Sequence, residues 1–140
     1  MSALLSREYQ KNYEDHFHKI LLDYPDRYWD ESALPAYTHS NRLIAWLFWQ
    51  RLGKAFQLSP DIAGKRVLDF GCGAGVSFKY LADQKCRITG CDNKADDLAR
   101  QTCAVFGLSA EITKDLFSLT GNFDYIFALD VLERGCVNPS

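Results

Sequence analysis

The 140-residue sequence lacks any apolar segment long enough to cross a bilayer. Its longest uninterrupted apolar run, Leu43 to Trp49, falls far short of the roughly 20 residues that a spanning helix needs. The first residues show no apolar signal core behind basic residues, and the chain contains neither an internal repeat nor a low-complexity tract. We therefore expect a cytoplasmic protein without a membrane span.

A large excess of charge of either sign is also missing. The formal net charge is -2 and the sequence pI is about 5.9, so no bulk positive field draws the protein to nucleic acid or to anionic lipid. A local basic patch remains compatible with these values. We therefore expect no nucleic-acid partner.

Paired cysteine spacings are absent as well. The five cysteines are odd in number and have neither the spacing of a metal site nor the density of a small secreted scaffold. We expect reduced thiols, most of them buried. His16 and His18 are two residues apart in a helical pattern, so their side chains point to different sides and would not hold one metal ion. The sequence predicts no metal site.

What the chain does contain is enough apolar material, 47% of its residues, for one modest core. Within residues 1–60, apolar side chains recur at helical spacing over Ser6–Leu22 and again over about Ser40–Phe56. The second segment is apolar on more than one side, which predicts a buried helix. We expect residues 1–60 to form a helical extension or a lid that includes the aromatic segment Tyr28-Trp29-Asp30; packing of that segment onto the sheet is the alternative.

Residues 61–140 change to short apolar runs that alternate with helical patterns. The expected strands are 65–70, 87–91, 110–113 and 123–129, with helices at about 76–83 and 94–106. Parallel strands need crossover connections, so this alternation predicts an α/β fold, a Rossmann-like parallel sheet with helices on both faces.

Three alternating glycines, Gly71, Gly73 and Gly75, follow the first expected strand. In open parallel sheets ligands bind at the carboxyl ends of the strands, and the first strand-to-helix turn is the usual place. Glycines let the backbone adopt conformations closed to other residues and let a ligand approach without meeting a Cβ atom. Taken alone, the triplet is also compatible with a tight connection that binds nothing.

Two acids make this signal more specific. Asp69 stands beside the turn, where a carboxylate would repel a pyrophosphate but suits a cationic amino group. The dinucleotide-binding fingerprint has its third glycine three positions after the second, where this chain has Val76. A nicotinamide-dependent oxidoreductase is therefore the less favoured alternative. Asp92 ends the next strand, where a carboxylate can accept hydrogen bonds from both ribose hydroxyls. Together the two carboxylates suit a nucleoside that carries a positively charged amino-acid tail. S-adenosylmethionine (SAM) is that ligand.

VLDFGCGAG at 67–75 and ITGCD at 88–92 resemble the first two motifs of the class I SAM-dependent methyltransferases, and FDYIFALDVLER at 123–134 is similar to the fourth-strand motif of that family. The resemblance covers about residues 64–134. The cofactor contacts that it implies are Asp69, Gly71, Cys72, Gly73, Gly75, Asp92, Asn93, Asp115, Leu116, Leu129 and Asp130.

Some of these residues have structural alternatives. Asp115 could cap a turn, and Asp130 could be the N-cap of a following helix. Cys72 reads as a small residue that fills the turn and not as a nucleophile, because nothing near it in sequence indicates a depressed pKa.

The N-terminal part has a looser likeness to the O-methyltransferases of quinone biosynthesis, through Tyr28-Trp29-Asp30 and His39-Ser40-Asn41-Arg42. This likeness implies that Arg42 pairs with the cofactor carboxylate; an exposed charge at a helix start is the alternative. The implied function is SAM-dependent methyl transfer to a small-molecule nucleophile, with O-methylation as one option. No catalytic residue is identifiable, although Tyr28, His16, His18 and His39 could act as a base on chemistry alone.

The sequence ends ten residues after Asp130, whereas the resemblance implies about three further strands. We expect a domain without its C-terminal strands, in which residues 61–140 are the SAM-binding half. A non-catalytic cofactor-binding fragment or scaffold is the alternative to an enzyme. The implied strand order is third, second, first, fourth, which leaves the fourth strand as an open edge through which the chain could self-associate.

Overall fold

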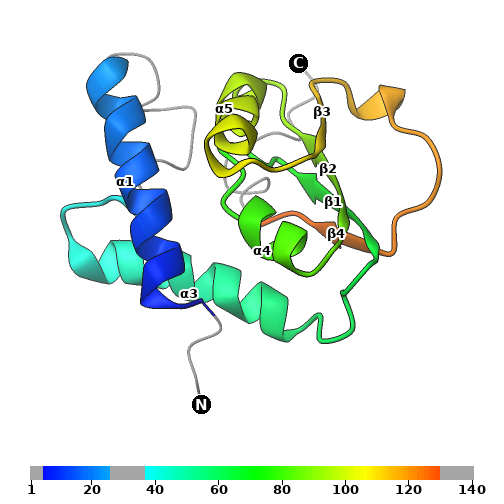
Figure 1. The fold of residues 1–140 in the computed structure, drawn as a ribbon, viewed down its shortest axis with the longest axis horizontal. Coiled ribbons are helices and arrows are strands. Elements are labelled where there is room, and N and C mark those ends of the chain that lie inside the picture. The colour runs from blue at the N-terminus through cyan, green and yellow to red at the C-terminus, as the bar shows by residue number, and fades with distance from the viewer. Residues whose placement is uncertain (1–4, 26–36, 130–140) are drawn as a thin grey trace, which may run out of the picture. The chain divides into compact units, whose positions relative to one another are not determined.

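The computed structural model describes residues 5–25 and 37–129. The chain divides into two compact units, Met1–Pro60 and Asp61–Ser140 (Figure 1). The segment Tyr28-Trp29-Asp30, predicted as part of a lid, and Asp130, predicted at the cofactor, lie outside the described residues. The lid function therefore stays a prediction.

Two helices, α1 (Arg7–Asp23) and α3 (Arg42–Gln57), build the first unit. Each begins at a residue whose side chain accepts a hydrogen bond from a backbone N–H of the first turn: Ser6 from Tyr9, and Asn41 from Leu43. Aromatic rings fill the space that the helices enclose. Tyr13, Phe17, Tyr37 and Trp49 are each at most 2% exposed, and the ring centroids of Tyr37 and Trp49 lie 4.7 Å apart.

The expected burial of the second helix on more than one side is wrong. Leu43, Trp46 and Leu47 on α3 are each more than half exposed, at 62%, 54% and 52%. The buried residues of α3 are Trp49, Leu52, Gly53 and Phe56. These buried positions recur at three- and four-residue spacing, so one stripe of the helix faces the core while Leu43, Trp46 and Leu47 face outward.

The second unit contains a sheet of four parallel strands in the order β3-β2-β1-β4, as predicted (Figure 1). The strands are β1 (Arg66–Phe70), β2 (Arg87–Cys91), β3 (Glu111–Thr113) and β4 (Tyr125–Phe127). The helices are α4 (Phe78–Asp83), α5 (Asp96–Phe106) and the short 3₁₀ turn η1 (Leu116–Ser118). The predicted Rossmann-like α/β fold is confirmed.

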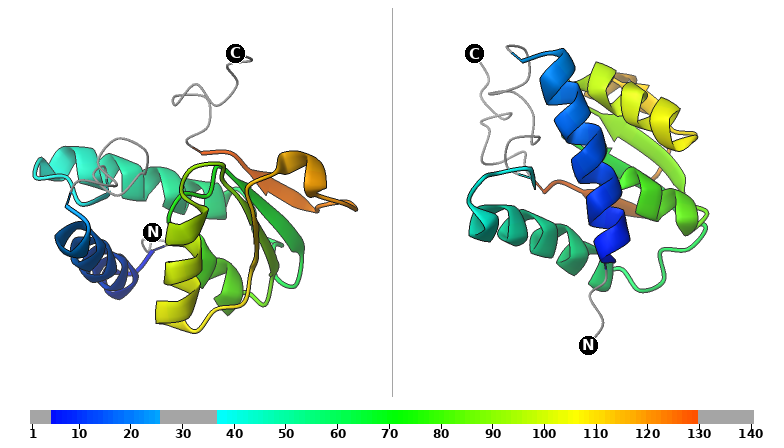
Figure 2. Two further views of the ribbon diagram at one scale, coloured as in Figure 1. Left: turned by 90° about the horizontal axis from the view of Figure 1, so that it is seen from above. Right: turned by 60° about the vertical axis from the view of Figure 1, so that its left-hand side comes forward.

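Helices α4 and α5 lie on the same face of the sheet (Figure 2), so the described α-helices of the second unit do not cover both faces as predicted. They connect β1 to β2 and β2 to β3, two steps in the same direction across the sheet, and right-handed crossovers place both helices on one side. Phe78 and Leu81 of α4 and Leu98 of α5 are fully buried. This layer supports the strands whose carboxyl ends carry the candidate site.

Phe78 fixes the distance between α4 and the sheet through two glycines. A Cβ atom at Gly90 would lie 2.8 Å from Phe78 Cζ, closer than packed atoms allow, and 3.0 Å from Cys72 Sγ, a tight contact. A Cβ atom at Gly75 would lie 2.5 Å from the same ring. The ring therefore occupies space that only glycine leaves open on β2 and at the turn.

No helix among the described residues is long and apolar enough to span a membrane. Cys72, Cys86, Cys91 and Cys103 are free thiols. Within residues 5–25 and 37–129 no group of three or more His, Cys, Asp or Glu side chains could hold a metal ion.

Candidate functional site

The glycine turn after β1 curls over the end of β2. Gly71, Gly73 and Gly75 all have positive φ values, 71°, 53° and 72°, in the region that L side chains rarely adopt. The backbone N–H groups of Gly71 and Cys72 both donate to the carbonyl oxygen of Cys91, at 2.7 and 3.2 Å. The carboxyl ends of β1 and β2 are thereby tied together.

Asp92 directly follows β2, and its carboxylate accepts hydrogen bonds from the glycine turn and from the loop after β2. Its Oδ2 accepts a hydrogen bond of 2.9 Å from the N–H of Gly73. Its Oδ1 accepts from the N–H groups of Lys94 and Ala95, at 2.9 and 2.8 Å. The side chain is buried, and a carboxylate has about four lone-pair sites. Three are used by backbone donors, so roughly one remains for a ligand.

Asp69 lies in the central strand β1, paired with Gly90 on one side and Phe127 on the other. Its Oδ2 accepts a hydrogen bond of 2.6 Å from the hydroxyl of Ser77, and both residues are buried. A second buried hydroxyl, that of Thr102 on α5, donates to the carbonyl oxygen of Ala74 at 2.6 Å. The turn is therefore supported from α4 and α5 as well as from β2.

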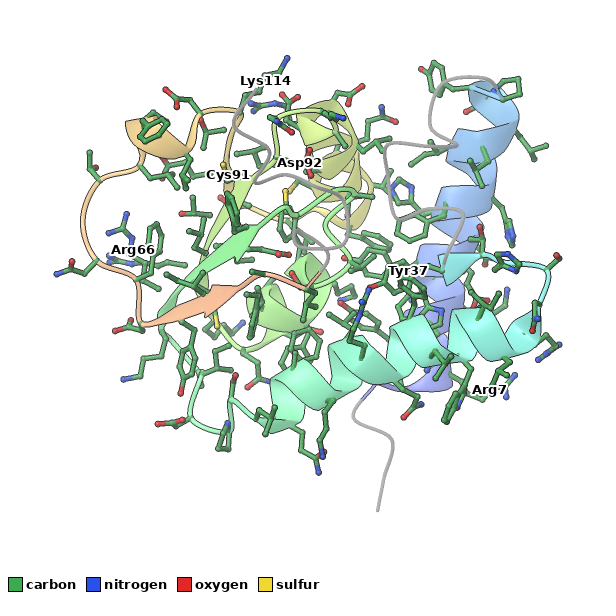
Figure 3. The ribbon with its side chains drawn as sticks, turned by 180° about the vertical axis from the view of Figure 1, so that it is seen from behind. Arg7, Tyr37, Arg66, Cys91, Asp92 and Lys114 are labelled. Carbon is green, nitrogen blue, oxygen red and sulfur yellow. The ribbon has the colours of Figure 1, made fainter. Side chains whose placement is uncertain are left out.

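A pocket of about 270 Å³ opens at the carboxyl ends of β1, β2 and β3. Figure 3 shows Cys91, Asp92 and Lys114 gathered at this end of the sheet, whereas Arg66 lies at the start of β1. The pocket is lined by Phe70, Gly71, Cys91, Asp92, Asn93, Lys114, Asp115, Leu116 and Phe117. Two carboxylates, a glycine of positive φ and two aromatic rings thus meet in one small space.

The pocket brings together five of the residues predicted from the sequence: Gly71, Asp92, Asn93, Asp115 and Leu116. Asp69, Cys72, Gly73 and Gly75 are buried and do not line it. Leu129, two residues beyond β4, is half-buried and also outside the lining. Arg42 is the first residue of α3 in the other unit, so its predicted contact with the cofactor stays a prediction.

Asp115 caps a turn, which is the structural alternative that the sequence left open for this residue. Its Oδ1 accepts from the N–H of Phe117 at 2.9 Å and so caps η1. The same residue lines the pocket, because the cap places the turn at its rim. A structural and a ligand-facing position are therefore compatible at this residue.

The thiol of Cys72 is not prepared for nucleophilic attack. Burial, followed by the negative charges of Asp69 and Asp92, raises the pKa of this thiol well above its ordinary value. Its Sγ lies 3.0 Å from the position that a Cβ atom of Gly90 would take, so the thiol packs against β2. These features agree with the prediction that Cys72 fills the turn.

Four residues that line the pocket were not predicted from the sequence: Phe70, Cys91, Lys114 and Phe117. Phe117 is the most informative, since its ring is 93% exposed at the rim of the pocket. The available signal was its position two residues after Asp115, in the loop after the third strand, because ligands bind at the carboxyl ends of the strands in such sheets.

A larger groove of about 910 Å³ lies within the first unit, along α1 and the start of α3. Its charged lining residues are balanced: Arg7, Lys11 and Arg42 against Glu8, Glu14 and Asp15. Lys11 and Asp15 form an ion pair of 2.9 Å. The aromatic lining residues are Tyr37, Trp46 and Trp49.

The chain is 30% identical over 93 residues to the ubiquinone biosynthesis O-methyltransferase of Pectobacterium atrosepticum, a match that covers 60% of this chain and 38% of that protein. It is 43% identical over 77 residues to the ribosomal RNA small subunit methyltransferase C of Cronobacter sakazakii, covering 51% of this chain and 22% of that protein. The chain thus spans less than half the length of these relatives.

Among solved structures, coclaurine N-methyltransferase bound to N-methylheliamine and SAH is similar with a TM-score of 0.54 and 16% identity, over 86% of this chain and 42% of that one. This likeness concerns the fold alone. A family model described as a methyltransferase domain matches residues 43–135, more than half of the sequence. The chain therefore belongs to the methyltransferase domain family.

Proposed function

We propose that this chain binds SAM at the glycine turn and acts as the cofactor-binding part of a methyltransferase. The observation that carries the proposal is the joint position of Asp69 and Asp92 at the carboxyl ends of neighbouring strands, on either side of three glycines of positive φ. The bound cofactor supplies a methyl group already activated on a sulfonium. The task left to the protein is to bind, orient and exclude water.

The pocket beside Asp92 suits the nucleoside end of SAM. Its volume, about 270 Å³, lies just below the usual range for small-ligand sites, as suits a pocket that holds only part of a ligand. Asp92 has room for about one ribose hydroxyl, and Asn93, which lines the same pocket, can bind the second. Asp115 and Leu116 at the opposite rim would hold the adenine.

The methionine end would lie over the turn. Positive φ at the three glycines keeps side chains away from the path of the ligand. Asp69 supplies the negative charge that an ammonium group requires. Cys72 and Gly73 would contact the ligand through backbone atoms, because the side chain of Cys72 is buried and Gly73 has none.

The acceptor that fits this chain best is a small molecule. The groove in the first unit has a volume within the range of small-ligand sites and is lined by three aromatic rings. Its positive and negative side chains are equal in number, whereas a surface for RNA needs an excess of lysine and arginine toward the phosphates. The likeness to an rRNA methyltransferase makes RNA the alternative acceptor.

A general base is not assigned. His18 and His39 line the groove, and Nδ1 of His39 accepts a hydrogen bond of 2.9 Å from the N–H of Asn41. That bond uses the lone pair of Nδ1, so the neutral ring carries its hydrogen on Nε2 and cannot take a proton from an acceptor there. A base is needed only if the attacking atom must lose a proton.

Transfer of a radiolabelled methyl group from SAM tests the proposal. The chain is incubated with labelled SAM and either a panel of phenols and amines or purified ribosomal RNA. Label on a small molecule is the expected result, and label on RNA alone would overturn the proposed acceptor class. Binding of SAM without transfer to any acceptor would support the non-catalytic alternative.

A further inference from the structure

Ser77 occupies the N-cap position of α4 but does not cap the helix. Its φ and ψ, -84° and -17°, are helical, and its side chain makes no hydrogen bond to the first turn. The caps of the two N-terminal helices behave differently, since Ser6 and Asn41 both accept from their own first turn. The hydroxyl of Ser77 has therefore been diverted to another partner.

That partner is the carboxylate of Asp69, at 2.6 Å. This separation is within the range of an O–H donor bonded to an ionised carboxylate. Ser77 is 1% exposed and Asp69 is 6% exposed, so water does not compete strongly for the contact. The bond joins two residues eight positions apart, across the glycine turn.

The main chain of Asp69 is already fixed by parallel pairing to β2 and β4. The remaining freedom is in its side-chain rotamer, and the bond to Ser77 restricts that. We propose that Ser77 is a positioning residue, which orients the Asp69 carboxylate toward the ammonium group of the cofactor and so sets the preference for ligands that carry an amino-acid tail. This inference rests on the proposed function.

Thr102 provides a matched control. It is also a fully buried hydroxyl beside the turn, with a bond of the same length, but it donates to the carbonyl oxygen of Ala74 and not to Asp69. Loss of this hydroxyl changes the support of the turn without releasing the Asp69 side chain. Any general loosening of the site would therefore follow Thr102→Val as well as Ser77→Ala.

The test compares two probes by calorimetry on the full chain: S-adenosylhomocysteine (SAH), which has the amino-acid tail, and 5′-methylthioadenosine, which lacks it. For Ser77→Ala we expect about a tenfold or greater loss of affinity for SAH and little change for methylthioadenosine, the effect of one hydrogen bond to a charged group. Thr102→Val should leave the ratio of the two affinities unchanged. Ser77→Thr, which keeps a hydroxyl, should restore the wild-type ratio.

Equal losses for both probes in Ser77→Ala, or an unchanged ratio, would overturn the positioning role. Asp69→Asn covers the case in which Ser77→Ala does not fold, because it removes the charge that Ser77 is proposed to orient. It should show the same selective loss of SAH affinity, and an unchanged ratio in this variant would contradict the inference. Failure of the wild-type chain to bind either probe would instead count against the proposed function.

Discussion

The backbone N–H of Gly73 donates a hydrogen bond of 2.9 Å to Oδ2 of Asp92, 19 residues further along the chain. The contact links the glycine turn after β1 to the first residue after β2. Because Oδ1 of Asp92 also accepts from Lys94 and Ala95, one carboxylate fixes both loops that border the pocket. Asp92 is therefore part of the architecture of the site before any ligand arrives.

Asp92→Asn should lower the stability of the ligand-free chain as well as ligand affinity. The amide places an N–H₂ group against a backbone N–H, which leaves at least one buried donor unsatisfied at a cost of about 1–3 kcal/mol. Urea unfolding measures the change. The control is Asp83→Asn, an exposed residue whose contact with Lys79 is 3.4 Å long, and a change of about 0.5 kcal/mol or less is expected there. Equal stabilities of wild type and Asp92→Asn would contradict the role of the Asp92 carboxylate in fixing the two loops.

Gly90→Ala should destabilise the second unit by about 1–3 kcal/mol, the usual range for overpacking. The added methyl group would meet the ring of Phe78 at 2.8 Å and Sγ of Cys72 at 3.0 Å. Phe78→Leu shortens the side chain at the point of collision, so the double variant should lose less than the sum of the single changes. Additive losses in denaturant unfolding would show that the two residues do not collide.

Because the pKa of His16 is lowered in the folded chain, we expect the free energy of unfolding to fall on mild acidification. Burial, with a smaller contribution from Lys19, lowers the pKa of His16 below its ordinary value of 6.5. Below that pH the unfolded chain binds a proton that the folded chain does not, so the free energy of unfolding falls as the pH drops. His16→Gln should flatten this dependence between pH 7.5 and 5.5. A variant with the wild-type slope would remove His16 from the explanation.

The open edge predicted for the fourth strand gives a test of self-association. Among the described residues β4 pairs with β1, and Ile126 in this strand is 62% exposed. If the chain associates through β4, Ile126→Lys should shift sedimentation velocity profiles toward the monomer. Val105→Lys on α5 changes a side chain of similar exposure, 61%, and should not. A wild-type chain that stays monomeric at all concentrations would contradict the prediction.

Much of the second unit could be predicted from the sequence because its signals are local. A short strand pattern that ends at Asp92 placed β2 at Arg87–Cys91, the same bounds that the structure gives. The parallel strand order followed from the family resemblance, and the positions of Asp69 and Asp92 at neighbouring strand ends followed from that order.

The parts that could not be predicted depend on contacts between distant residues. A serine after a glycine turn indicates a helix cap, and nothing in its neighbourhood shows that Ser77 bonds to Asp69 instead. The saturation of Asp92 by three backbone donors is equally invisible in the sequence. The outward-facing part of α3, with Trp46 more than half exposed, was missed because composition does not tell which side of an apolar helix meets the core.

Calorimetric titration of the full chain with SAH measures directly whether the turn held by Asp92 and Asp69 is a SAM site. We expect saturable 1:1 binding, displacement by SAM, no competition by NAD, and strong weakening in Asp92→Asn under conditions in which that variant is folded. A folded wild-type chain that binds NAD in place of SAH, or that binds neither, would contradict it.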